Sequence, residues 1–285
     1  MKSYIPTATA IALVMALAAC NVQPAAENNT AETAAPATAA AASLDALSGT
    51  WKADLASLKF EGKPDEYLLK DGSYSCASCI PPLTIAADGK VHPVADRPYY
   101  DSMSVREVDD KTVEFKRMKG GKEVSSSTHS VSADGKVLTV KFKDMTTPGQ
   151  TIEGTGTSQR VGEPVAGAHA ISGQWKEDKI ADYSEDALNV TFAIAGDNVT
   201  MNSSGQTYTA KLGGPAVPIK GDTGGTTMKV TREGASALRE TSIRDGKEVG
   251  YSVITPSADG KSINFVYTDN RNGAKTSWTG AKQGG

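Results

Sequence analysis

The sequence has few of the side chains on which metal centres and nucleophilic active sites depend. Its 285 residues include three cysteines and three histidines, and aromatic residues make up 6% of the chain. The histidines, His92, His129 and His169, are dispersed, and the chain lacks a nucleophile elbow, a zinc-protease helix and a phosphate-binding loop. We therefore expect no metal, no cofactor and no catalytic residue, and we favour a non-enzymatic protein.

A surplus of one charge and a long apolar run are also missing. Lysine and arginine total 30 against 33 aspartate and glutamate residues, which gives a formal net charge of −3. Nucleic-acid-binding domains gather basic residues on one face, whereas here they are scattered, so we expect no nucleic-acid partner. After Ser43 no apolar run is long enough to cross a bilayer as a helix.

The N-terminus does contain a short apolar segment ahead of a cysteine. Lys2 supplies a positive start, residues 11–17 are apolar, and Leu-Ala-Ala-Cys at 17–20 resembles a bacterial lipobox. This pattern predicts a signal peptide over residues 1–19 and lipidation of Cys20. The alternative is an ordinary secretory signal that is cut close to the same point. Several acyl chains on one cysteine give stable anchoring, because a single chain binds only marginally.

The segment at 20–47 is rich in alanine, threonine, proline, asparagine and glutamate. Such a composition buries too little apolar surface to offset the entropy lost on ordering, so it predicts a disordered tether behind the lipidated cysteine. Asn21 resembles the sorting pattern of outer-membrane lipoproteins. We therefore expect a cell-envelope protein on the outer membrane, facing the periplasm or the cell surface.

The remainder of the chain is an internal duplication. Gly-Lys-Glu-Val at 121–124 recurs at 246–249, and Ser-Ala-Asp-Gly-Lys at 132–136 recurs at 257–261, both at an offset of 125 residues. Repeats of this kind indicate a tandem architecture. The first repeat spans 48–161, a linker spans 162–171, and the second repeat spans 172–285.

Both repeats carry the pattern of half-buried antiparallel strands. Residues 137–144 and 262–268 alternate between apolar and polar side chains, which is the period of a strand with one buried face. Asp-Gly pairs precede these runs, and they suit the positive φ angles of a type I′ hairpin turn. The sequence predicts an all-β fold of two antiparallel meander barrels, each with about eight strands and its own core.

Each repeat opens on Gly-x-Trp, at Trp51 and at Trp175. This start resembles that of lipocalin-like, calycin-type barrels, and with the lipoprotein signal the chain is similar to an uncharacterised family of bacterial envelope lipoproteins. The resemblance implies that a basic residue on the last strand packs across each tryptophan, and Arg160 and Lys282 are placed to do so. Such a barrel either holds a ligand or is packed solid and closed at one end.

Lipidation of Cys20 would leave Cys76 and Cys79 as an even pair. In an oxidising compartment such a pair is usually bonded. A redox pair needs a low-pKa thiolate, typically at a helix N-terminus, and a zinc site needs two more ligands, for which His92 is the one candidate nearby. We interpret the pair as a structural disulfide, with metal binding and redox activity as alternatives.

The leading functional hypothesis is a lipid-anchored envelope protein that binds a small apolar ligand, a lipid or a partner protein. The alternative is an envelope enzyme or enzyme inhibitor with a site at the interface of the two repeats. A cluster of titratable residues in a cleft would favour the enzyme. An apolar barrel mouth would favour the ligand-binding protein, and a filled barrel with an exposed apolar patch would favour a protein partner.

Overall fold

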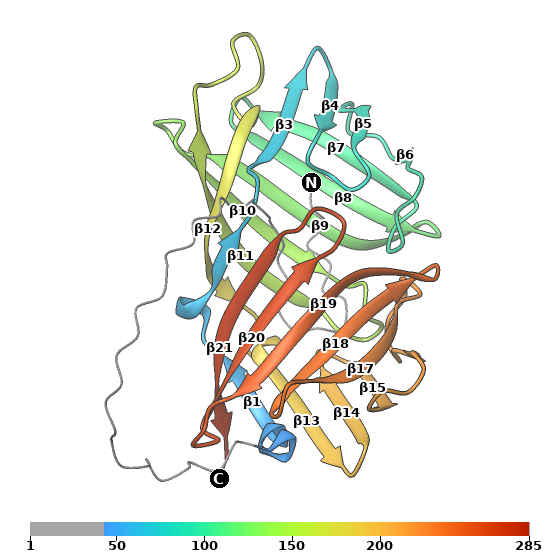
Figure 1. Cartoon of the computed structure of the whole chain (residues 1–285). Coiled ribbons are helices and arrows are strands. Elements are labelled where there is room, and N and C mark those ends of the chain that lie inside the picture. Colours follow the sequence, from blue (N-terminus) through green and yellow to red (C-terminus); the bar gives the residue numbers. More distant parts are fainter. Residues whose placement is uncertain (1–42, 285) are drawn as a thin grey trace, which may run out of the picture.

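The computed structural model describes residues 43–284, which form two antiparallel, nearly closed β-barrels (Figure 1). The remaining elements are three short 3₁₀ helices, η1 (Leu44–Leu47), η2 (Leu55–Ser57) and η3 (Glu185–Leu188). Within the described range no helix combines the length and the apolar character that crossing a bilayer requires. The lipobox, Cys20 and Asn21 lie outside the described residues.

The first barrel, at the top of Figure 1, is a ten-stranded sheet in the order β5-β4-β3-β12-β11-β10-β9-β8-β7-β6. The amide of Gly89 donates to the carbonyl of Val105 (2.9 Å) and so narrows the gap between its two edges. Its strands are β3 (Asp65–Lys70), β4 (Ser73–Cys76), β5 (Leu83–Ala86), β6 (His92–Pro93), β7 (Ser102–Asp109), β8 (Thr112–Lys119), β9 (Lys122–Val131), β10 (Val137–Asp144), β11 (Ile152–Val161) and β12 (Gly173–Tyr183).

The second barrel has the order β15-β14-β13-β1-β21-β20-β19-β18-β17-β16, and β2 (Lys59–Glu61) pairs with β21 as an eleventh strand. Reciprocal backbone hydrogen bonds between Thr207 and Lys220, of 3.0 and 2.8 Å, join its edges. Its other strands are β1 (Gly49–Ala53), β13 (Asn189–Ala195), β14 (Asn198–Ser203), β15 (Gln206–Lys211), β16 (Val217–Pro218), β17 (Thr227–Glu233), β18 (Ala237–Arg244), β19 (Lys247–Pro256), β20 (Ser262–Asp269) and β21 (Lys275–Gln283).

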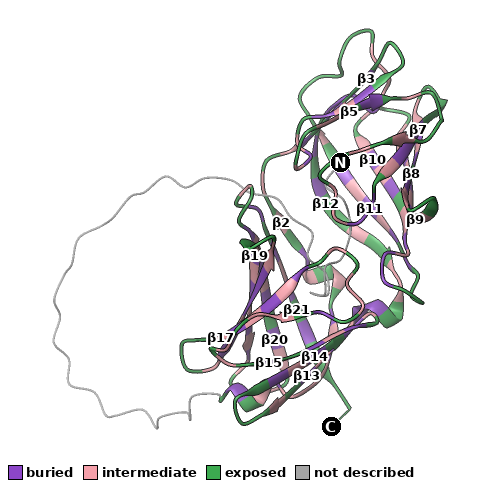
Figure 2. Ribbon diagram, turned by 90° about the vertical axis from the view of Figure 1, so that its right-hand side faces the viewer, coloured by how far each residue is buried: buried purple, intermediate pink, exposed green. Residues whose placement is uncertain are grey.

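The predicted all-β fold of two antiparallel barrels is confirmed, and the strand count is higher than the expected eight. Two-residue strands, β6 and β16, contribute to the difference. The cores arise from the expected alternation: all six residues of β3 alternate between buried and exposed, and buried positions recur along the strands of both barrels (Figure 2). A side chain at every second position thus fills each interior, as the strand period requires.

The first strands of the two repeats are exchanged between the barrels. β1 lies between β13 and β21, which both belong to the second repeat, whereas β12 pairs with β11 and β3 of the first repeat. Trp51 is accordingly buried in the core of the second barrel and Trp175 in the core of the first. This arrangement differs from the expectation that each repeat closes its own core.

The segment expected to link the repeats has a different role. Residues 162–172 connect β11 to β12, which are neighbours in the first barrel. The chain crosses between the barrels elsewhere, at residues 62–64 between β2 and β3, and through η3 between β12 and β13. The repeats at 48–161 and 172–285 therefore describe the sequence duplication, whereas the first barrel is formed by residues 65–183.

The last residues of the expected tether belong to the fold. Leu44 and Leu47, in η1, are 1% and 0% exposed and join the core of the second barrel. The indole Nε1 of Trp51 donates to the carbonyl of Leu47 (2.8 Å), and Trp175 makes the same bond to Ile171 (2.8 Å). The prediction of disorder over 20–47 is wrong for residues 44–47, because two leucines supply enough apolar surface to order this turn.

Candidate functional site

Both tryptophans of the Gly-x-Trp motifs lie beneath a basic side chain. The Arg160 guanidinium carbon is 4.0 Å from the centre of the Trp175 ring, and Lys282 Nζ is 5.1 Å from that of Trp51. The strand exchange decides these partners, because each basic residue covers the tryptophan of the other repeat. The four residues that the resemblance to lipocalin-like barrels points to do form two pairs, but each pair combines a residue of the first repeat with one of the second.

Arg160 acts as a closing group for the first barrel. Its Nε donates to the carbonyl of Gly135 (2.6 Å), Nη1 to that of Ser172 (2.8 Å) and Nη2 to that of Ala170 (2.6 Å). Burial lowers the pKa of the guanidinium. Every nitrogen of the group thus bonds to a loop of the same barrel, which supports a structural role.

The interior of the first barrel holds a buried polar cluster. Arg117 and His129 are 5% and 2% exposed, Arg117 Nη1 donates to Ser125 Oγ (3.3 Å), and Ser127 Oγ lies 3.2 Å from His129 Nε2. Beside them is a cavity of about 10 Å³. A cavity of that size has room for one water molecule, so this part of the barrel interior is filled.

The contact between Ser127 and His129 has the spacing of a nucleophile and its base. Burial and the nearby Arg117 lower the pKa of His129 to about 3. An efficient general base has a pKa close to the working pH, and neither side chain is accessible to a substrate. We therefore interpret the cluster as part of the packing of the barrel.

The buried histidine predicts a loss of stability in acid. Between pH 6.5 and 3 the unfolded chain binds a proton at His129 that the folded chain does not. The free energy of unfolding therefore falls by about 1.4 kcal/mol for each unit by which the pH is lowered in this range. We expect His129→Ile, which copies Ile254 of the second repeat, to remove this slope. Urea unfolding of both proteins from pH 3 to 8 measures the free energy of unfolding at each pH. Parallel plots of this free energy against pH for the two proteins would contradict the prediction.

The other two histidines lie apart from this cluster. His92 Nε2 is 2.7 Å from Asp88 on the surface, and His169 Nε2 is 2.7 Å from the carbonyl of Asp109. Within the described residues no group of three or more histidine, cysteine, aspartate or glutamate side chains is arranged to hold a metal ion.

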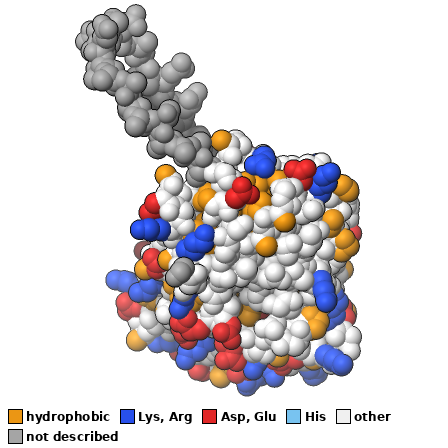
Figure 3. Space-filling view, turned by 90° about the horizontal axis from the view of Figure 1, so that it is seen from below, with side chains coloured by type: hydrophobic (Ala, Val, Ile, Leu, Met, Phe, Trp, Pro, Cys, Tyr) orange, Lys and Arg blue, Asp and Glu red, His pale blue; other side chains and the backbone are white. Residues whose placement is uncertain are grey.

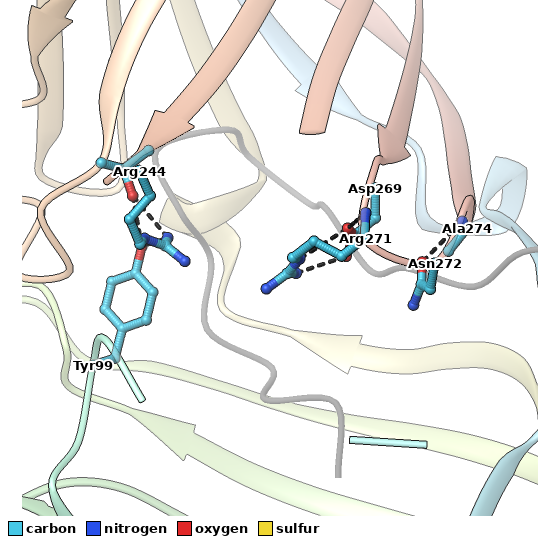
Figure 4. Close-up of polar contacts among 7 residues, drawn as sticks. Tyr99, Arg244, Asp269, Arg271, Asn272 and Ala274 are labelled. Atoms are coloured by element: carbon cyan, nitrogen blue, oxygen red, sulfur yellow. Dashed lines mark hydrogen bonds and ion pairs between the residues drawn. The ribbon is translucent and has the colours of Figure 1, made fainter. Parts of the chain in front are cut away.

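The barrels contact each other through matching positions of the two repeats. The ring of Tyr99 packs on Gly224, its counterpart at an offset of 125, where an added Cβ would lie 2.4 Å from the ring. Lys119 Nζ donates to the carbonyl of Thr223 (2.7 Å), and its counterpart Arg244 donates to the Tyr99 hydroxyl (3.1 Å; Figure 4). Counterparts that contact one another are the mark of a two-fold interface.

The two-fold relation does not hold at the contact that Gln206 makes. On one side Gln206 Nε2 donates to Thr147 Oγ1 (2.9 Å), and this bond joins the barrels. On the other side the counterparts of these residues are Pro81 and Asn272. Here Asn272 and Ile80 line a cleft of about 460 Å³. The cleft therefore lies where one side of the interface lacks the contact that Gln206 and Thr147 make on the other side.

The first barrel supplies most of the cleft wall. The sulfurs of Cys76 and Cys79 are 2.18 Å apart, at disulfide distance, and Cys79 borders the cleft. Ser78 donates to a carboxylate oxygen of Asp65 (2.9 Å) and accepts from the amide of Glu66 (3.1 Å), so the turn is attached to β3. The lining residues are Lys63, Pro64, Glu66, Ala77, Ser78, Cys79, Ile80, Gln174, Arg271 and Asn272.

The second barrel contributes Arg271 and Asn272 from a tight loop. Arg271 bonds through Nε (2.9 Å) and Nη2 (2.6 Å) to Asp269, which is 1% exposed. Burial alone would lower the pKa of Arg271, but the hydrogen bond and charge of Asp269 outweigh it and the pKa is raised. Asn272 Oδ1 accepts from the amide of Ala274 (2.9 Å; Figure 4). These hydrogen bonds thus hold the polar side chains of Arg271 and Asn272 in place.

The cleft offers recognition chemistry. It combines two cations, Lys63 and Arg271, one carboxylate, Glu66, two side-chain amides and a short apolar strip. Sequence reasoning missed these residues, although the cysteine pair that occurs in one repeat alone indicated one wall. Comparisons with known proteins add no relative, because no protein-family model and no curated protein matches the chain.

Proposed function

We propose that this protein is a non-enzymatic binding protein of the bacterial cell envelope and that its ligand occupies the cleft between the barrels. The cleft volume of about 460 Å³ falls within the usual range for ligand sites, which favour domain interfaces. Its lining combines several polar side chains with a short apolar strip, which suits a polar ligand. The departure from two-fold symmetry at this cleft is the observation that carries the proposal.

The barrel interiors support this choice over a lipocalin-type cavity. Trp51, Trp278 and Leu47 are fully buried in the core of the second barrel, and the cavity beside His129 in the first is of water size. The face shown in Figure 3 is mostly uncharged, with charged side chains toward its margin. Among the ligands expected from the sequence, a polar segment of a partner protein suits the cleft better than a lipid.

The cleft residues favour binding over catalysis. An active site needs a nucleophile beside a base, or an acid and base with displaced pKa values. The cleft pairs Arg271 with Asp269, which keeps the arginine a permanent cation, and Cys79 is bonded to Cys76. The enzyme alternative therefore finds neither a free thiol at Cys79 nor a basic group at Arg271.

A tryptophan that fills the cleft is expected to abolish ligand binding. Ala77 is exposed and borders the cleft, so Ala77→Trp places a large ring in it, whereas Asn202→Trp places the same ring at the counterpart position of the second repeat. Saturation-transfer NMR with a panel of small carboxylates and amides measures binding to the full-length protein. Hits should disappear in Ala77→Trp and persist in Asn202→Trp. Equal hits in both variants, or none with the natural chain, would contradict the proposal.

Anchoring is proposed on the lipobox alone. We expect labelled palmitate to enter the natural protein and to be lost from Cys20→Ser, because the cysteine thiol is the acylation site. Membrane fractionation follows the consequence, with the natural chain in the outer-membrane fraction. An unlabelled natural protein in the soluble periplasmic fraction would contradict it.

A further inference from the structure

The position opposite the cleft is occupied by a hairpin turn of the chain itself. Residues 203–206 join β14 to β15 and lie against the first barrel. An added Cβ on Gly205, whose φ is +76°, would lie 2.5 Å from Gln150 and 3.2 Å from Thr147. Gln206 is 3% exposed and bonds to Thr147. The turn at 203–206, with Gly205 at its tip and the side-chain amide of Gln206, thus fills this side of the interface.

The counterpart turn in the first repeat is held away from the opposite barrel. It comprises residues 78–81, and Cys79 is buried in the core of its own barrel through the bond to Cys76. Ser78 is attached to Asp65, and the carbonyl of Pro81 accepts a hydrogen bond from Arg97. Each of these contacts lies within the first barrel. The space that the turn of the second repeat fills is therefore left as the cleft.

We propose that the cleft takes the turn of a β-hairpin from a partner protein, in the place that residues 203–206 hold on the opposite side. This inference rests on the proposed function and names the partner class. The side-chain amides of Gln174 and Asn272 can each donate and accept hydrogen bonds, as the backbone N–H and C=O groups of a turn require. Asp269 offsets the charge of Arg271, and Glu66 offsets that of Lys63, which favours an uncharged turn that carries an amide side chain, as Gln206 does.

The chain supplies the probe for a direct test. A fluorescently labelled cyclic peptide with the sequence of residues 198–211 presents the same turn, and fluorescence anisotropy reports its binding to the full-length protein. We expect saturable binding that Ala77→Trp weakens by roughly tenfold or more, while Asn202→Trp leaves it unchanged. A peptide with Gly205→Val should also lose binding, because a β-branched residue does not adopt the positive φ of the turn.

The outcomes separate this inference from the proposed function. Absence of peptide binding, or equal binding to Ala77→Trp, overturns the hairpin proposal. If small carboxylates or amides still bind and are displaced by Ala77→Trp, the cleft remains a ligand site with a different ligand class. If neither peptide nor small molecules bind, both proposals fail.

Discussion

Replacing Trp51 with alanine is expected to destabilise the second barrel, although Trp51 belongs to the first repeat. The ring is 0% exposed and packs in the core of the second barrel, whose other members lie mainly at residues 188–278. Removal of a buried tryptophan costs about 3–5 kcal/mol. Hydrogen exchange read by mass spectrometry should show faster exchange in β13 to β21 and little change in β3 to β11.

Trp175→Ala is the matched control for this experiment. It removes the same ring from the counterpart position, which lies in the core of the first barrel. The expected pattern is therefore reversed, with faster exchange in β3 to β11. If each substitution instead loosened the barrel of its own repeat, the strands would not be exchanged in solution.

A fragment of residues 62–183 is expected to fold alone as a complete barrel. It contains β3 to β12, which are all ten strands of the first barrel in one continuous stretch. The fragment 48–161, cut at the boundaries of the sequence repeat, lacks β12 and leaves β3 and β11 as open edges. β1 has five residues against eleven in β12, so it does not cover the same length.

Circular dichroism and size-exclusion chromatography compare the two fragments. Residues 62–183 should melt cooperatively as a monomer, whereas residues 48–161 should aggregate or melt without cooperativity, because open edges pair with other chains. A cooperative, monomeric 48–161 together with an unfolded 62–183 would show that the repeat and the barrel coincide.

The fold class was predictable because its signals are local. Asp134 accepts hydrogen bonds from the Ser132 hydroxyl (2.6 Å) and the Lys136 amide (3.1 Å), and Asp259 makes the same bonds in the second repeat. A turn of this kind involves neighbouring residues alone, as does strand alternation. A single sequence therefore contains all the information that these elements need. The expected type I′ geometry is wrong, because Gly135 and Gly260 have positive φ angles whereas Asp134 and Asp259 do not.

The strand exchange could not be predicted because the two exchanged strands open on the same motif. Trp51 and Trp175 both follow glycine and one polar residue, and both indoles donate at 2.8 Å to a carbonyl four residues earlier. The chain crosses between the barrels at 62–64 and 184–188, away from both motifs, so a local pattern carries no information about the barrel that each strand joins.

The cleft was missed for a related reason. Its walls come from residues 63–66, from the turn that ends at Ile80, from Gln174 and from Arg271 with Asn272. These segments meet because the exchanged strands hold the barrels together. The cysteine pair was the one visible sign, since it shapes a turn that the second repeat builds without it.

The strand exchange is the central claim, and engineered disulfides test it most directly. Thr50 lies opposite Thr191 in the sheet, with 2.8 Å between the hydroxyl oxygens. Without exchange, Thr50 would take the place that Gln174 holds opposite Glu66. Mass spectrometry of the full-length variants should find a bond between the new cysteines in Thr50→Cys/Thr191→Cys and none in Thr50→Cys/Glu66→Cys. A bond in the second variant and none in the first would contradict the account.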